Sequence, residues 1–166
     1  MKIENPAALR FVMQEDIYFL PADKTEQPVV IEQPVLTTQI TDLNYLGKYK
    51  KGFLIVANYA NEEYMAADHI AALENILKRK DYGMDDVAIF NRFTYPDVNF
   101  EQVQTYFNPQ KLLLLGKDAL PANLQQLAFN QPQKINEYAA LYTFSFDEMM
   151  DNTPNKKAFW DQVKNL

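Results

Sequence analysis

The chain has 166 residues, 48% of them hydrophobic, which is enough for one domain with a core of its own. It contains no cysteine, which excludes a disulfide framework and a thiolate metal site, and no apolar stretch approaches the ~20 residues that cross a bilayer. Its formal net charge of −6 makes it a poor general binder of DNA or RNA, because phosphate neutralisation is the main source of nucleic-acid affinity. The first residues lack the apolar stretch of a secretory signal, so we expect a soluble protein of the reducing cytoplasm.

Residues 1–42 are predicted to form an N-terminal segment and an extended connection. The Asn-Pro pair that opens residues 5–13 is a helix start, since Asn caps free N–H groups and Pro suits the first helical position. Residues 17–20 are a short apolar run closed by a proline, which indicates a strand or extended segment. Residues 22–42 are polar and contain two prolines, which argues against a helix there.

Residues 43–166 are predicted to form an α/β domain. Continuous apolar runs, which suit strands covered on both faces, occur at Phe53–Asn58, Val87–Phe90, Lys111–Gly116 and Tyr138–Phe144. Helical patterns separate and follow them: a helix capped by Asn61 and ended by 81–83, a short helix at 100–107, a turn after Pro121, the segment 146–150 and a final helix opened by Thr153-Pro154. This alternation predicts a three-layer α/β/α domain with a mainly parallel four-stranded sheet.

Little in the sequence predicts chemistry at the strand ends, where open α/β sheets usually bind ligands. The four glycines, at 47, 52, 83 and 116, are too scattered for a phosphate-binding loop, so Gly116-Lys117-Asp118 alone does not predict a nucleotide site. His69, the only histidine, lies mid-helix and is interpreted as a half-buried, satisfied residue. Glu62 and Glu63 are interpreted as first-turn helix charges. We therefore predict no catalytic, cofactor-binding or metal-binding residue and no enzyme activity.

Two short stretches invite other interpretations. The basic cluster of Lys48, Lys50 and Lys51 is predicted to be a solvated approach to a strand. The stretch Gln125–Phe129 loosely resembles the short peptides that dock on sliding clamps. The helical spacing of Leu124, Leu127 and Phe129 favours core anchors instead.

The two ends of the chain carry a resemblance to a known family. Leu9–Asp23 has a leucine-containing turn that runs into an aromatic and leucine-containing segment ended by proline. Asp147–Leu166 has an Asn and a Pro before a helix with an adjacent Phe-Trp pair. Both patterns, together with the Phe53–Ala57 strand between them, resemble the psi subunit of bacterial DNA polymerase III. The chain departs from that family in its Thr25–Asp42 insertion and in its acidic charge.

The resemblance implies a non-enzymatic adaptor of the clamp-loader assembly, with a fold related to uracil-DNA glycosylases but without their active site. It implies that the N-terminal segment binds clamp-loader subunits and that the folded domain contacts a chi-like subunit. The anchors of the N-terminal segment would be its large apolar side chains: Phe11, Met13, Ile17, Tyr18 and Phe19. For the N-terminal segment, the alternative is that these residues cover the domain's own sheet. For the whole protein, the alternatives are a small-molecule or nucleotide-binding α/β module and, after that, a divergent enzyme.

Overall fold

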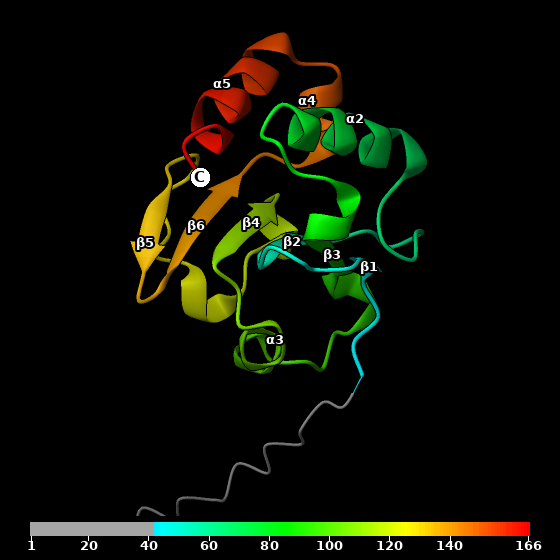
Figure 1. Ribbon diagram of the computed structural model, residues 1–166, viewed down its shortest axis with the longest axis vertical. Coiled ribbons are helices and arrows are strands. Elements are labelled where there is room, and N and C mark those ends of the chain that lie inside the picture. The colour runs from blue at the N-terminus through cyan, green and yellow to red at the C-terminus, as the bar shows by residue number, and fades with distance from the viewer. Residues whose placement is uncertain (1–41) are drawn as a thin grey trace, which may run out of the picture. The chain divides into compact units, whose positions relative to one another are not determined.

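A computed structural model describes residues 42–166, and the elements predicted within residues 1–41 lie outside them. The described residues form a mixed α/β domain with a six-stranded sheet. Figure 1 shows how its elements are arranged. Its strands are β1 (Leu46–Gly47), β2 (Phe53–Ala57), β3 (Val87–Asn91), β4 (Lys111–Leu115), β5 (Gln133–Ile135) and β6 (Tyr138–Thr143). Its helices are α2 (Ala67–Lys78), α3 (Phe100–Phe107), α4 (Phe146–Met150) and α5 (Thr153–Val163). None of the helices in this part of the chain has the length and hydrophobicity to cross a membrane.

The sheet is mixed and has the strand order β1-β3-β2-β4-β6-β5. β2 pairs in parallel with β3 on one side and β4 on the other, and β6 pairs in parallel with β4. The two edge strands, β1 and β5, are antiparallel to their neighbours. The sheet has two strands more than the four predicted. The additional edge strands, of two and three residues, are too short to show a hydrophobic alternation.

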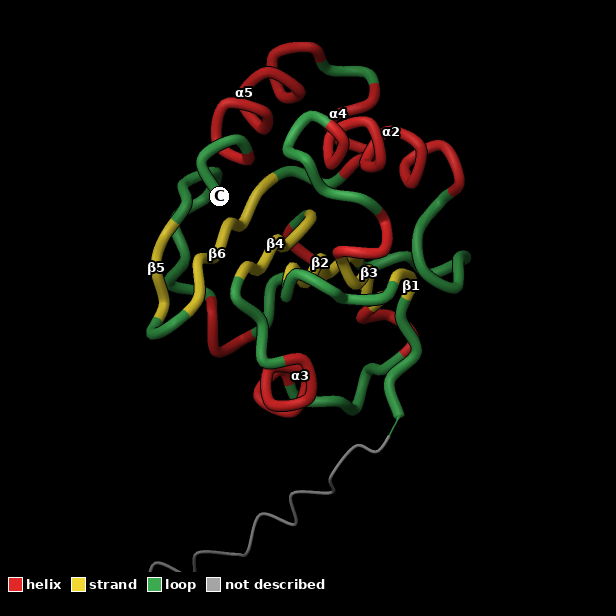
Figure 2. Tube along the Cα trace, in the orientation of Figure 1, coloured by secondary structure: helices red, strands yellow, loops and turns green. Residues whose placement is uncertain are grey.

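The central position of β2 is confirmed, and so is that of β4 beside it. Phe53–Val56 are at most 1% exposed, and Leu113 faces Ile55 in the register of the two strands. Alternate side chains of β2 point to opposite faces, so Phe53 and Ile55 pack in one core cluster while Leu54 and Val56 pack in another. The first cluster contains residues of α2, α4 and α5, and the second contains residues of α3. Figure 2 shows these helices on opposite sides of the strands.

β1 depends on a glycine. Gly47 has a φ of +110°, and a Cβ atom there would lie 2.1 Å from the carbonyl oxygen of Val87 on β3. A side chain would thus collide with the backbone of the strand that β1 pairs with. Only glycine permits this edge pairing.

The first described helix begins later than predicted. α2 begins at Ala67 instead of at Asn61, and its N-cap residue, Ala66, makes no side-chain capping bond. Glu62 and Glu63 precede the helix, so their interpretation as first-turn charges is wrong; Asp68 has that position. The side chain of Asn91 holds the loop before α2 through hydrogen bonds described below, which favours a loop over an early helical turn.

The C-terminal helix is confirmed as an amphipathic element. Its cap is Asn152, whose side chain accepts from the backbone N–H of Asn155, and a proline occupies the first turn. Phe159 and Val163 are each 1% exposed, whereas Trp160 is only partly buried.

Candidate functional site

The loops after the strands are held together by the protein's own hydrogen bonds. Asn91, at the end of β3, is 1% exposed. Its Oδ1 accepts from the backbone N–H groups of Tyr59 at 3.0 Å and Phe93 at 3.2 Å. Its Nδ2 donates to the carbonyl oxygens of Tyr59 at 2.9 Å and Glu62 at 2.8 Å. An asparagine amide offers two donors and an acceptor oxygen with two lone pairs, so Asn91 has no free position for a ligand.

Gly116, the glycine after β4, also makes its contacts within the protein. The N–H of Gly116 donates to the carbonyl oxygen of Thr143 at 2.9 Å, and a Cβ atom at Gly116 would lie 2.9 Å from the Cβ of Ser145. Ser145 in turn caps α4, where its Oγ accepts from the N–H of Glu148 at 3.2 Å. The side of Gly116 that lacks a Cβ atom therefore packs against Ser145, so a phosphate group has no room to approach the glycine from that side.

His69 has a partner, as predicted, but it is buried where a half-buried residue was expected, and it lies in the first turn of α2 where a mid-helix position was expected. Its side chain packs between two aromatic rings: Nδ1 lies 2.8 Å from the Tyr59 hydroxyl oxygen, and the ring stacks on Phe146 with centroids 5.4 Å apart. Nε2 lies 4.0 Å from a carboxylate oxygen of Asp147, whose side chain is 77% exposed. Burial, followed by the charge of Asp147, raises the pKa of the Tyr59 phenol, so this hydroxyl stays protonated. Within residues 42–166, no three His, Asp or Glu side chains are grouped so that they could hold a metal ion.

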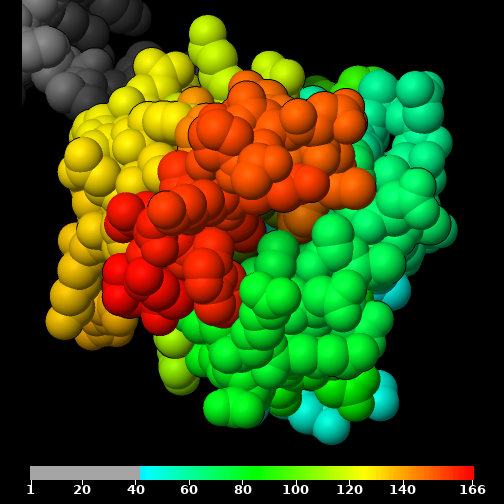
Figure 3. All heavy atoms as spheres, turned by 90° about the horizontal axis from the view of Figure 1, so that it is seen from above, coloured from blue at the N-terminus to red at the C-terminus, as the bar shows by residue number. Residues whose placement is uncertain are grey.

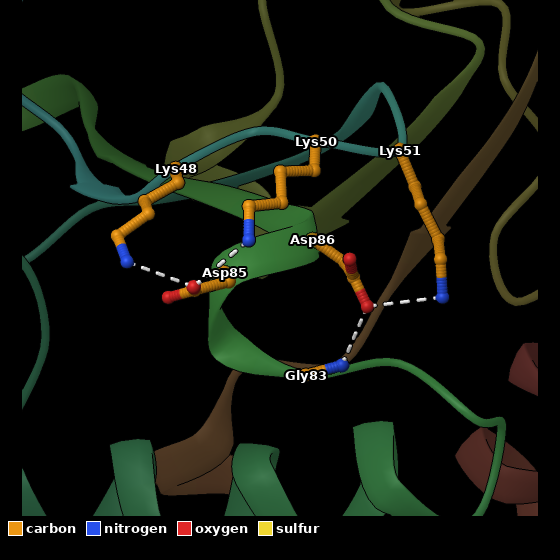
Figure 4. Close-up of polar contacts among 6 residues, drawn as sticks. All are labelled: Lys48, Lys50, Lys51, Gly83, Asp85 and Asp86. Carbon is orange, nitrogen blue, oxygen red and sulfur yellow. Dashed lines mark hydrogen bonds and ion pairs between the residues drawn. The ribbon is translucent and has the colours of Figure 1, made fainter.

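The basic cluster before β2 is paired with carboxylates, as Figure 4 shows. Lys48 and Lys50 place Nζ 2.9 Å and 3.2 Å from Oδ2 of Asp85, and Lys51 places Nζ 3.0 Å from Oδ2 of Asp86. The hydrogen bonds from Lys48 and Lys50 lower the pKa of Asp85. The three lysine side chains are 49–66% exposed, in agreement with the predicted solvated approach to the strand. All three ammonium groups are thus paired, Lys48 and Lys50 with the same carboxylate, so the cluster does not form a free basic patch.

An apolar groove lies on the outer face of the helices. It has a volume of about 290 Å³ and is bordered by α2, α4 and α5. Its lining residues are Ala72, Asn75, Ile76, Arg79, Phe146, Met149, Met150, Lys156, Phe159 and Trp160. In Figure 3 the green surface of α2 meets the orange and red surface of α4 and α5 on this face. The Arg79 guanidinium lies 5.7 Å from the centroid of the Trp160 ring. Most of the residues that line this groove are apolar.

Sequence reasoning missed the groove because its apolar residues were interpreted as core. Two adjacent pairs, Met149-Met150 and Phe159-Trp160, carried the signal. Neighbouring side chains on a helix point in different directions, so only one member of each pair fits the buried stripe. Met149 and Phe159 are 2% and 1% exposed, while Met150 and Trp160 lie at the partly exposed border.

The other sequence-predicted residues have mixed outcomes. The predicted anchors of the N-terminal segment, Phe11, Met13, Ile17, Tyr18 and Phe19, lie outside the described residues. Leu124 and Leu127 are core residues, at 4% and 5% exposed. The prediction that Phe129 anchors the core is wrong, because its side chain is 46% exposed and lies against the rings of Tyr142 and Phe144. Phe129 forms an isolated β-bridge with Tyr142, so it is not part of a helix and the helical spacing that suggested its burial does not apply.

The sequence matches no protein-family model, and it matches no curated protein. Its function is therefore inferred from the geometry of residues 42–166 and from the resemblance of the two ends of the chain.

Proposed function

We propose that this protein is a non-enzymatic adaptor subunit of the DNA replication clamp-loader assembly, similar to the psi subunit, and that it acts through protein–protein contacts. The main observation behind this proposal is that the apolar groove lies between helices α2, α4 and α5 and not at the ends of the strands. A small-molecule site in an α/β domain usually combines a concave pocket with convergent polar groups at the strand ends. Here the polar groups at the strand ends, such as Asn91, bond to the protein itself, and the groove is bordered by helices instead.

The proposed assembly has two contact regions. The N-terminal segment, through Phe11, Ile17 and Phe19 among its apolar residues, would bind the clamp-loader subunits, since large buried side chains commonly dominate interface energy. The folded domain would bind a chi-like subunit. A three-layer α/β/α domain with four parallel strands would agree with the glycosylase-related fold that the resemblance implies. DNA would be reached through partners, because the cluster at 48–51 is already paired with carboxylates.

A reconstitution experiment tests this function. The full chain and a variant lacking residues 2–21 are each mixed with purified clamp-loader subunits of the source organism and separated by size-exclusion chromatography. The full chain should co-elute with the subunits. The deletion variant should elute alone while it retains a cooperative thermal transition, because the binding anchors lie outside the 43–166 domain.

Two results would contradict the proposal. If the deletion variant folds and still co-elutes, then the N-terminal segment is not needed for binding to the clamp-loader subunits. A variant that aggregates would favour the alternative that residues 9–20 cover the domain's own sheet. The alternative of a nucleotide-binding module predicts saturable calorimetric binding of a nucleotide at micromolar concentration, which the adaptor proposal does not.

A further inference from the structure

The charges at the groove have one sign. Of its ten lining residues, the two that carry charge are Arg79 and Lys156, although the whole chain has 22 acidic and 16 basic side chains. In the part of the chain that the structure describes, neither of them belongs to an ion pair; Arg79 instead lies over the Trp160 ring. The lysines at 48–51, by contrast, each have a carboxylate partner. The groove is therefore a cationic opening on an acidic protein, and it is complementary to a negatively charged ligand.

The floor of the groove is apolar and adaptable. Phe146, Met149 and Phe159 form its base and are at most 2% exposed. Met150 is partly exposed beside them, and an unbranched thioether side chain adjusts readily to the shape of a bound group. A volume of about 290 Å³ lies just below the roughly 300–1,000 Å³ typical of small-molecule sites. That space suits one or two large side chains better than a cofactor.

We propose that this groove docks a short acidic peptide segment of a partner protein. One or two large apolar side chains of the segment would lie on the floor, and flanking carboxylates would pair with Arg79 and Lys156. Apolar grooves bordered by helices are a recurring mode of peptide recognition. This inference rests on the proposed adaptor function only in requiring a protein partner, and it does not require that partner to be a clamp-loader subunit.

Peptide display tests the chemistry of the ligand directly. A library of short random peptides on phage is selected against the immobilised full chain, and the enriched sequences are synthesised with a fluorescent label. Fluorescence anisotropy then measures their dissociation constants at low and high salt. The enriched peptides should combine aromatic or large aliphatic residues with Asp or Glu, and their affinity should fall as salt screens the cationic rim.

Matched variants test the place of binding. Lys156→Glu should weaken peptide binding roughly tenfold at low salt, because it reverses a charge at the rim. Lys157→Glu makes the same change on the next residue of α5, which is exposed and outside the groove, and should change the affinity less than roughly twofold. Ile76→Gln should weaken binding by removing an apolar contact, and Phe129→Gln, at an exposed aromatic outside the groove, is its control. Thermal unfolding of each variant verifies that it is folded.

Several results would overturn the inference. These are enrichment of basic or purely polar peptides, equal effects of the two lysine variants, and binding of decanoate or anionic vesicles with no peptide binding. Sedimentation could also reveal a dimer that Ile76→Gln dissociates, which would assign the groove to a second copy of the chain. Because no clamp-loader protein is present in these measurements, their outcome is independent of the reconstitution that tests the proposed function.

Discussion

The hydrogen bonds of Asn91 predict a large effect from a single substitution. Asn91→Ala removes four hydrogen bonds, three that join β3 to the loop after β2 and one to the N–H of Phe93 just after β3. A typical bond contributes about 0.5–1.5 kcal/mol, which gives a sum of about 2–6 kcal/mol. The carbonyl of Glu62 belongs to an exposed residue and regains water, while the groups of Tyr59 remain partly buried. We therefore expect a loss of about 3 kcal/mol in the free energy of unfolding.

Urea unfolding followed by tryptophan fluorescence measures this loss. The chain has a single tryptophan, Trp160, on α5, so the signal reports global unfolding rather than the loop itself. Amide hydrogen exchange adds a local reading, because the N–H groups of Tyr59 and Phe93 lose their acceptor and should exchange faster. The matched control is Asn165→Ala, at an exposed residue whose side chain donates one hydrogen bond.

The control should lose less than about 0.5 kcal/mol. If Asn91→Ala costs less than about 1 kcal/mol, or no more than the control, then the loop is not held by this side chain. The interpretation of the strand ends as structural would then be refuted.

Three further predictions concern the core and the edge of the sheet. Leu113→Ala, at the centre of β4, should cost about 2–5 kcal/mol in urea unfolding through lost burial and the remaining cavity; a loss below about 1 kcal/mol would contradict its central position. Tyr49→Phe should leave the free energy of unfolding unchanged or raise it by about 1 kcal/mol, because the buried Tyr49 hydroxyl has no hydrogen-bond partner; a clear loss would show that it has one. The hydrogen bond from Lys48 is the main reason why the pKa of Asp85 is lowered below the ordinary 3.8 in the folded state. The ionised Asp85 therefore stabilises the fold above pH 3.8, and this stabilisation is lost as the pH falls through the folded pKa. Asp85→Asn should remove this part of the acid dependence from the thermal midpoint measured across a pH series, and an unchanged profile would contradict it.

The central strands were predictable because a strand that is buried on both faces has an almost continuous run of apolar residues. Phe53–Ala57 and Leu112–Leu115 are short continuous apolar runs, and their length favours a buried strand over a helix. The edge strand at Leu46–Gly47 was not predictable in the same way. It depends on a positive φ and on a close approach to Val87, and both are tertiary facts.

The start of α2 shows the same limit for helices. Asn61 and two acidic residues form a plausible helix start, yet the side chain of Asn91, thirty residues along the chain from Asn61, holds this stretch as a loop. A long-range hydrogen bond of this kind leaves no trace in local propensity. The groove was partly predictable, since the pairs Met149-Met150 and Phe159-Trp160 place more apolar surface on two helices than one buried stripe can take.

The adaptor function is tested most directly by isothermal titration calorimetry of the full chain into the purified clamp-loader subunits. The proposal predicts saturable heat with a whole-number stoichiometry. It predicts no such heat when a nucleotide replaces the subunits. Saturable nucleotide binding together with no heat from the subunits would contradict the adaptor function and favour a ligand-binding module.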